Sequence, residues 1–540
     1  MSAYEWDWGP YALDTEAEKR FVSLDRTDLL KICDVINVGR EKPKTTGFVP
    51  VHYENGSLFV LKGENHVRVC GESGTKKSRT VCRGSIICSA LCGHSIAVTD
   101  PKGELYGDAK LQGILKERGY DIRCLNFRTM DQDGINLLGP AYDLFAQGKG
   151  QESDAYINRF LSMLTEDIGS PNQDPFWNNN SSLILAAAIR LLRNMLVQQN
   201  DRERFHLASV NTFLRQDKEE LERLFATMVQ DAPVRDPLRE YYNYLQSAAD
   251  RTFSSLILTA QSLLSDMNSS DSLLRMLCAD TFRMADLYTH KVAVFLIIPD
   301  ETFCYNRVAG FVINLLYETL IQEFAAKYEG RRKGPPHRVN FICDEVASVK
   351  LQDINAKVSA SRSRCISFLF IYQSEAQMRL VYSDYDTVVG NCRHYLFLGS
   401  SDFEQLRYVS QSLGQSGLSQ EGSAPLVSVD DLRRMEKRKT CKDALVTVGN
   451  RYILCARLPD YDVYPFLKPI RIPEEKRNVL PQRIYLCTPE DIVSEYRQGK
   501  IKFSGGQSRQ AVSAKPFEDL DALTEDFDSL FENEDDSWEE

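Results

Sequence analysis

The stretch GESGTKKS at residues 71–78 differs by one letter from a phosphate-binding loop. The pattern G-x-x-x-x-G-K-[ST] requires glycine at position 76, where this chain has Lys76. In such a loop, main-chain N–H groups and a helix N-terminus face the phosphates, the lysine meets the β- and γ-phosphate oxygens, and the hydroxyl residue holds Mg²⁺. Gly71, Lys77 and Ser78 suit that chemistry. The stretch is therefore a working variant of a nucleotide site, a damaged one, or a chance basic turn.

Lys76 is the departure from the pattern. Glycine at this position lets the backbone approach the phosphates closely, so we expect a long side chain to force the loop wider. The extra ammonium would also attract phosphate. Weak binding or slow hydrolysis is therefore one expectation, and under that hypothesis Lys76→Gly would raise ATP affinity or turnover.

Length and composition favour a soluble protein of several domains. A chain of 540 residues exceeds one ordinary core, and 43% hydrophobic with 26% charged residues is a globular composition. The longest uninterrupted apolar run, VAVFLII (292–298), has the length of a buried strand, and the N-terminus lacks a signal-peptide pattern. Fourteen scattered cysteines without a CxxC pair suit a reducing compartment. We expect a cytoplasmic protein that does not itself span a membrane.

The net charge of −11 is unevenly placed. Residues 517–540 contain twelve Asp and Glu and no Lys or Arg, so the rest of the chain has a formal charge of about +1. Apolar residues recur in this tail at three- and four-residue spacing. This favours a disordered segment that folds onto a basic groove of a partner, with a merely solubilising tail as the alternative.

The order of patterns along the chain predicts one α/β sheet interrupted by an all-helical insertion. Short apolar runs that end in Gly, Asp or Pro begin at His66, give way to helical spacing, and resume at about residue 291. The predicted divisions are an N-terminal region 1–62, a first part of the sheet domain 63–150, an all-α insertion 151–290, a second part of the sheet domain 291–470, and a C-terminal extension 471–540.

Two carboxylates follow the apolar run of VNFICDE (339–345). Ligands bind at the carboxyl edge of parallel sheets, so Asp344 is placed to join the shell of a Mg²⁺ ion and Glu345 to orient or deprotonate an attacking water. A strand that ends in two solvated acids is the alternative. We expect Lys77 and Asp344 to meet at adjoining strand tips around one triphosphate pocket.

A third apolar run, CISFLFIYQ (365–373), ends at Gln373, which would sense the γ-phosphate or the attacking water. A glutamine that merely starts the next loop is the alternative. Arg362 and Arg364 precede this run, either as a finger that reaches a neighbouring subunit or as ordinary surface charge.

With these residues laid out, the chain resembles the type IV coupling proteins, the TraG-like conjugative DNA-transfer ATPases. The resemblance covers roughly residues 65–470. The matching stretches are IAVTDPKGELYG (96–107), DPFWNNNSSLILAAAIRLL (174–192), VFLIIPDETFCYN (294–306), VNFICDEVAS (339–348), SRSRCISFLFIYQSEAQM (361–378), GNCRHYLFLGSSDFEQLRYVSQSLGQ (390–415) and DDLRRMEKRK (430–439).

This resemblance implies a RecA-like P-loop NTPase sheet interrupted by an all-α domain, a ring of six subunits, and ATP with Mg²⁺ as cofactors. It implies DNA, a relaxase or relaxosome, and secretion-channel proteins as partners. Glu345, Lys77, Gln373, Arg362 and Arg364 are the predicted catalytic residues, and Ser78 and Asp344 the predicted Mg²⁺ ligands. The predicted nucleotide-binding residues are Gly71, Glu72, Ser73, Gly74, Thr75, Lys76, Lys77 and Ser78.

The chain departs from this family in having no evident membrane-spanning start, so either a partner anchors it at the inner face of the membrane or it is a cytoplasmic branch. Three functions stay open: an ATP-driven coupling motor, a coupling-like adaptor that does not hydrolyse ATP, and a related DNA motor outside conjugation.

Overall fold

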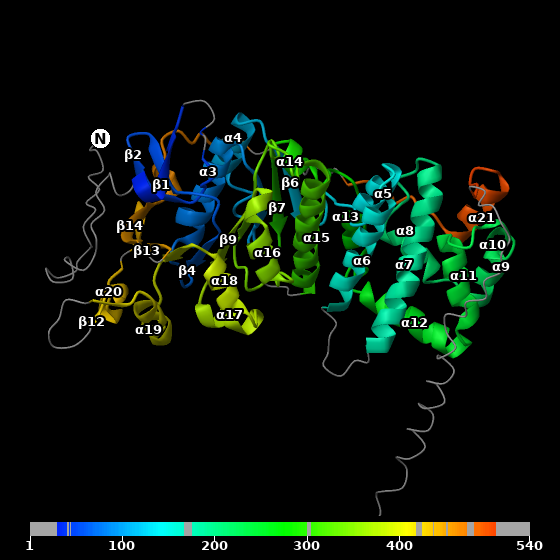
Figure 1. Cartoon of the computed structure of the whole chain (residues 1–540). Coiled ribbons are helices and arrows are strands. Elements are labelled where there is room, and N and C mark those ends of the chain that lie inside the picture. The colour runs from blue at the N-terminus through cyan, green and yellow to red at the C-terminus, as the bar shows by residue number, and fades with distance from the viewer. Residues whose placement is uncertain are drawn as a thin grey trace, which may run out of the picture. The chain divides into compact units, whose positions relative to one another are not determined.

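The computed structural model describes residues 30–39, 43, 45–166, 175–299, 304–416, 424–435, 437–449, 452–471 and 480–503. The chain divides into two units (Figure 1). The first, here called the α/β unit, comprises Met1–Leu137 and Ser265–Ile484; the second, the helical unit, comprises Leu138–Leu264 and Tyr485–Glu540. The acidic segment 517–540 lies outside the described residues, as do residues 1–29.

The α/β unit is built on a sheet of nine described strands in the order β14-β13-β10-β4-β9-β8-β5-β7-β6. The seven strands from β10 to β6 are parallel, and β13 and β14 add an antiparallel hairpin at one edge. The strands are β4 (Val67–Cys70), β5 (Ser95–Thr99), β6 (Asp121–Asn126), β7 (Val292–Ile297), β8 (Val339–Cys343), β9 (Ile366–Tyr372), β10 (His394–Phe397), β13 (Cys441–Val448) and β14 (Tyr452–Pro459).

The central strands are mostly apolar because both faces of the sheet are covered. Every residue of β7 and β9 is buried. Alternate side chains of β9 point to opposite faces: Leu369 shares a core with helix α3 (Arg83–Cys92), whereas the ring of Phe368 packs 5.9 Å from that of Tyr317 on helix α15 (Cys304–Lys327). Two layers of helices therefore hold the carboxyl ends of the strands in fixed positions.

A three-stranded antiparallel sheet, in the order β1-β3-β2, packs on the α3 side. It accounts for the described part of the expected N-terminal region 1–62. The remaining described elements of the α/β unit are β1 (Cys33–Asn37), β2 (Pro50–Glu54), β3 (Ser57–Leu61), η1 (Ser78–Cys82), α4 (Ala109–Glu117), α13 (Asp271–Cys278), α14 (Asp286–Thr289), α16 (Ile354–Ala360), η2 (Arg362–Arg364), α17 (Glu375–Val381), α18 (Tyr385–Asn391), α19 (Phe403–Ser412), β11 (Gln415–Ser416), β12 (Ala424–Pro425), α20 (Val429–Arg433) and η3 (Tyr461–Val463).

The described helical unit contains only helices. They are α5 (Gly139–Ala146), α6 (Gly150–Glu166), α7 (Pro175–Gln198), α8 (Leu207–Phe213), α9 (Lys218–Phe225), α10 (Met228–Asp231), α11 (Pro237–Ser247), α12 (Asp250–Leu263) and α21 (Pro489–Arg497). Helix α21 joins this unit from the far end of the chain: Arg204 Nη2 donates to Glu495 Oε1 at 2.8 Å, and His206 Nε2 lies 3.1 Å from the carbonyl oxygen of Tyr485.

The bounds of the helical unit differ from the insertion expected at 151–290. The unit comprises Leu138–Leu264 and the residues from Tyr485 onward, whereas α13 and α14 belong to the α/β unit. Helical spacing of apolar residues predicts a helix but does not tell which of two cores the helix faces.

Two helices of the described chain are long and apolar enough to cross a membrane, namely Asn179–Gln198 and Tyr305–Lys327. Both were missed by a search for uninterrupted apolar runs because polar residues punctuate them. About two thirds of each is buried (67%), as in the core helices of soluble proteins, so length and composition alone are weak evidence for a membrane span.

Candidate nucleotide-binding site

The stretch 71–78 forms the turn between β4 and a helical segment, as predicted. The main-chain N–H of Gly71 donates to Tyr372 O (3.2 Å) and that of Glu72 to Gly399 O (3.1 Å), which fixes the turn between the ends of β9 and β10. A Cβ at Gly71 would lie 2.7 Å from Thr75 Oγ1, so glycine is required there. The turn runs into η1, a π-helical segment continuous with α3. A helix N-terminus therefore faces the cavity at the sheet edge.

Lys77 and Ser78 meet the predicted acidic residues across this edge. Lys77 is buried, its Nζ donates to the carbonyl oxygens of Gly71 (2.5 Å) and Glu72 (3.2 Å), and it lies 4.0 Å from Glu345 Oε1. Ser78 Oγ donates to Asp344 Oδ2 at 3.1 Å.

The strands that carry these residues are not neighbours, however. The expectation of adjoining strand tips was wrong, because β9 lies between β4 and β8 and pairs with both. A parallel strand inserted between the two widens the gap between their ends. The turn that precedes Lys77 and the long side chain of this residue still bring the groups to one pocket.

Asp344 is buried, and its Oδ1 has no hydrogen-bond partner among the described residues. Burial, reinforced by the charge of Glu345, raises the pKa of Asp344 to about 6. An unsatisfied buried carboxylate oxygen beside a serine hydroxyl is an arrangement that a hard divalent cation would satisfy. The residues present therefore fit Mg²⁺, with Ser78 and Asp344 as the groups that would hold it.

Glu345 and Gln373 are held together at the mouth of the same pocket. Gln373 Nε2 lies 3.2 Å from both carboxylate oxygens of Glu345. Glu345 has a φ of 55°, a left-handed conformation that is uncommon for residues other than glycine, and the next residue, Val346, is tied by its N–H to Ile371 O at 3.0 Å. Such backbone strain is concentrated at functional sites. The geometry holds the carboxylate of Glu345 toward the cavity.

The cavity has a volume of about 460 Å³ and is lined by residues 73–78, Asp344, Glu345 and Gln373, together with residues whose role the sequence did not suggest. These additional residues include Asp100, Lys102, Glu104, Asn306 and Lys437. Asp100 directly follows the buried strand β5, so the rule that pointed to Asp344 would also have found it.

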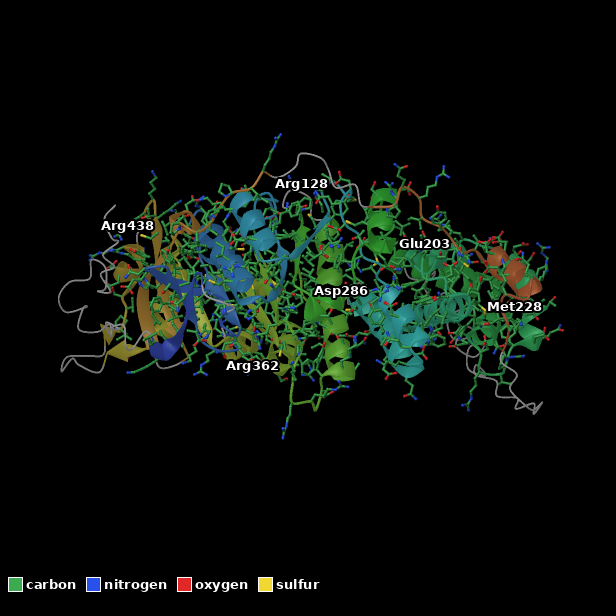
Figure 2. All side chains as sticks on the ribbon, turned by 90° about the horizontal axis from the view of Figure 1, so that it is seen from above. Arg128, Glu203, Met228, Asp286, Arg362 and Arg438 are labelled. Carbon is green, nitrogen blue, oxygen red and sulfur yellow. The ribbon has the colours of Figure 1, made fainter. Side chains whose placement is uncertain are left out.

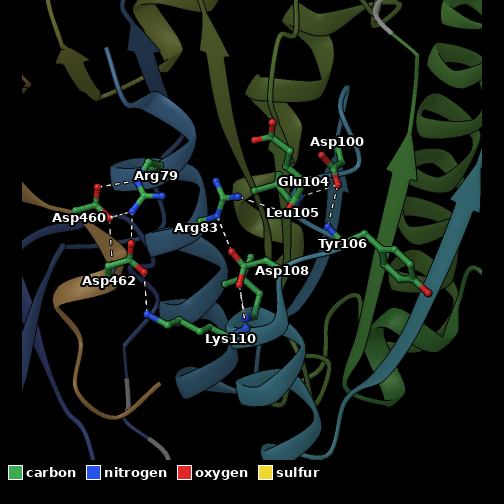
Figure 3. A network of polar contacts seen from close by, with 11 residues as sticks. Arg79, Arg83, Asp100, Glu104, Leu105, Tyr106, Asp108, Lys110, Asp460 and Asp462 are labelled. Carbon is green, nitrogen blue, oxygen red and sulfur yellow. Dashed lines mark hydrogen bonds and ion pairs between the residues drawn. The ribbon is translucent and has the colours of Figure 1, made fainter. Parts of the chain in front are cut away.

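A network of hydrogen bonds and ion pairs fixes the segment that follows Asp100 (Figure 3). Asp100 Oδ2 accepts from the main-chain N–H groups of Leu105 (2.9 Å) and Tyr106 (2.8 Å). Arg83 Nε, one helical turn after Ser78, donates to Asp108 Oδ2 at 2.9 Å. These contacts hold the helix that follows the phosphate loop against the segment that follows Asp100.

Arg362 and Arg364 lie away from this cavity. They form η2 at the amino end of β9, whereas Gln373 follows its carboxyl end, and a seven-residue strand spans roughly 20 Å. Arg364 Nη1 donates to Ala360 O at 2.8 Å, and Arg362 is exposed (Figure 2). Within one chain these arginines cannot reach the pocket that their own Glu345 lines.

The twelve cysteines whose side chains the structure describes are all free thiols. Among the described residues there is also no group of three or more His, Cys, Asp or Glu that could hold a metal ion. The two Mg²⁺ ligands predicted from the sequence, one hydroxyl and one carboxylate, are not a group of that kind.

Comparison with known proteins places this geometry in context. The family described as type IV secretory system conjugative DNA transfer matches residues 25–444. A bacterial conjugative coupling protein, TrwBΔN70, solved in a trigonal form with sulphate, is 16% identical, with 82% of this chain and 93% of that chain covered and a TM-score of 0.51.

Two further solved structures give lower scores. The plasmid coupling protein TrwB in complex with the ATP analogue ADPNP is 16% identical, covers 79% of this chain and 90% of its own, and has a TM-score of 0.49. VirB4 of Thermoanaerobacter pseudethanolicus is 14% identical, with 77% and 98% covered and a TM-score of 0.43. No curated protein matches the chain.

The likeness to TrwBΔN70 confirms the α/β fold predicted from the sequence. The family match extends over more than three quarters of the chain and includes the phosphate loop and all of the acidic and amide residues at the sheet edge. The chain belongs to the conjugative DNA transfer family of type IV secretory systems.

Proposed function

We propose that this chain is an ATP-driven coupling protein of a conjugative type IV secretion system, which recruits a relaxase–DNA complex and moves DNA to the secretion channel. Family membership supports the role in conjugative transfer. The observation that supports ATP as the energy source is the contact between Ser78 and Asp344, with Lys77 and Glu345 in the same cavity.

The proposal assigns tasks to five residues of the cavity. Lys77 leaves the carbonyl oxygens of Gly71 and Glu72 and donates to the β- and γ-phosphate oxygens. Ser78 and Asp344 would hold Mg²⁺, which would supply positive charge to offset that of the phosphates. Glu345 orients the attacking water and accepts its proton. Gln373 positions Glu345 and lies where an amide would detect the γ-phosphate.

Direct measurement of nucleotide binding and turnover tests the proposal. We expect the purified full chain to bind ATP in the presence of Mg²⁺, measured by calorimetry, and to release phosphate faster when DNA is added. Absence of binding would overturn the proposal altogether. Binding without any turnover, with or without DNA, would instead favour the adaptor that does not hydrolyse ATP, which the lysine at position 76 makes the second candidate.

Arg362 and Arg364 are assigned by this proposal to a neighbouring subunit, in a ring of six. We expect Arg362→Ala to lower ATP turnover of the assembled protein about 100-fold or more, because arginine fingers are worth roughly 10³–10⁵ in rate, and to leave ATP affinity unchanged. Arg332 is exposed and does not line the cavity, so Arg332→Ala is the matched control.

Mixing two inactive variants distinguishes a role between subunits from one within a subunit. Arg362→Ala subunits retain Glu345, and Glu345→Gln subunits retain Arg362, so a mixed assembly contains some pockets with both groups. Recovery of turnover on mixing is the expected result. An unchanged rate in Arg362→Ala alone would show that the arginines are ordinary surface charge.

The partners follow from the same proposal. DNA, relaxosome proteins and channel proteins would contact the assembled ring, and a membrane partner would hold it at the inner face of the cell membrane. The acidic segment 517–540, with twelve carboxylates, would bind a basic groove on one of these partners.

A further inference from the structure

Lys76 adopts the backbone conformation that the phosphate-loop glycine would supply. Its φ is 66°, in the left-handed region, which costs a residue with a Cβ on the order of 1 kcal/mol or more. The sequence predicted that Lys76 would force the loop wider. The structure instead keeps the turn, and the side chain of Lys76 makes contacts that would offset this cost.

Those contacts lead away from the phosphate cavity. Lys76 Nζ donates to Asp460 Oδ2 at 2.9 Å and to the carbonyl oxygen of Lys439 at 2.7 Å. The lysine side chain is 11% exposed and the aspartate side chain 1%. A buried, charge-assisted pair of this kind contributes more than a surface ion pair.

Asp460 is itself held as a charged acceptor. It directly follows β14, and its main-chain N–H donates to Thr440 O at 2.8 Å. Its carboxylate also accepts from Arg79 Nε (2.8 Å) and Arg79 Nη2 (2.7 Å), as Figure 3 shows. Burial acts to raise the pKa of Asp460, but the hydrogen bonds from Arg79 and Lys76 outweigh it and lower the pKa.

The segment that carries Asp460 touches the phosphate loop at a second point. Lys437 Nζ, which lines the cavity, donates to Gly74 O at 2.7 Å. The ammonium group of Lys76 on the loop thus points away from the cavity, and that of Lys437 from a distant segment points to the loop.

We infer that Asp460 is a positioning residue for the phosphate loop, which holds the side chain of Lys76 outside the cavity and thereby keeps the loop in its left-handed turn. This inference rests on the proposed function, since the turn matters only if the loop binds a triphosphate. Lys76 then stands where the pattern has glycine, its contact with Asp460 stabilises the turn, and the loop is not damaged.

A double-mutant cycle tests this inference. Asp460→Asn should weaken binding of ATP with Mg²⁺ about tenfold or more, because loss of a charge-assisted bond is worth roughly a factor of ten or greater. In the Lys76→Gly background the same change should have little effect, since glycine needs no support for a positive φ. Lys76→Gly alone should bind within about threefold of the wild type. Calorimetry measures all four affinities.

Asp462→Asn is the matched control. Asp462 contacts Arg79 and Lys110, and no contact between its side chain and Lys76 is found in the described structure, so its loss should not change the affinity. Thermal unfolding of each variant without nucleotide shows that it is folded, and it should reveal the same coupling between Lys76 and Asp460 in the melting temperature.

The outcomes separate this inference from the proposed function. If the wild type does not bind ATP, the proposed function fails and the positioning role fails with it. If the wild type binds and Asp460→Asn binds equally well, only the inference fails. An equal loss in both backgrounds would show that Asp460 acts through Arg79, and a large gain in Lys76→Gly would favour the damaged-loop hypothesis; either result overturns the inference.

Discussion

Glu345→Gln should abolish ATP turnover and leave ATP binding in place. The carboxylate is the predicted acceptor of the proton from the attacking water, and loss of such a group lowers rates by roughly 10² to 10⁴. Glutamine keeps the shape and can still contact Gln373. Lys77 lies 4.0 Å from Glu345, so removal of the negative charge of Glu345 should leave the affinity for ATP unchanged or raise it. Phosphate release and calorimetry measure the two effects.

The control for this variant is Glu104→Gln. It makes the same chemical change at an exposed residue of the same cavity, without a contact to Lys77 among the described residues. Turnover should stay within about twofold of the wild type, as for most surface changes. Turnover that survives in Glu345→Gln would contradict the proposed role of Glu345 as the acceptor of the proton from water.

Asp344→Asn should remove the dependence of ATP binding on Mg²⁺ and stabilise the nucleotide-free protein. In the wild type, a carboxylate whose pKa is raised to about 6 must be buried in charged form at pH 7, with one oxygen unsatisfied. A neutral amide is less costly to bury, so the melting temperature should rise by a few degrees, as expected for about 1 kcal/mol or more in a domain of this size.

The comparison for this second variant is Asp100→Asn, also buried at the cavity but bonded to main-chain N–H groups and not to Ser78. It should keep the Mg²⁺ dependence. If Asp344→Asn lowers the melting temperature and still needs Mg²⁺ to bind ATP, then Asp344 is a structural residue and the cation is held elsewhere.

Much of this site follows from one local rule. A polar residue at the carboxyl end of a buried parallel strand lies at the edge of the sheet where ligands bind. The rule places Asp344 and Gln373 together because each directly follows a run of apolar residues, and the phosphate-loop pattern adds Lys77. It does not give the order of strands, which depends on crossovers between distant segments, and so the position of β9 between β4 and β8 was missed.

Lys76 shows a second limit of prediction from the sequence. A motif comparison sees only that a glycine is absent, and it predicts a distorted loop. The partner that prevents the distortion, Asp460, is 384 residues away and belongs to a stretch that reads as an ordinary end of a strand. Contacts of this range cannot be inferred from local spacing. Likewise the pattern SRSR could not show that Arg362 lies at the opposite edge of the sheet from its own pocket.

The distance along the chain between Lys76 and Asp460 has a consequence for biosynthesis. Ribosomes add roughly 5 to 20 residues per second, so the partner of Lys76 emerges about 20 to 80 s after the loop itself. During that interval a nascent chain carries a complete phosphate-binding stretch without the residue that supports its turn. An incomplete chain would then bind nucleotide more weakly than a finished subunit and would compete poorly for it.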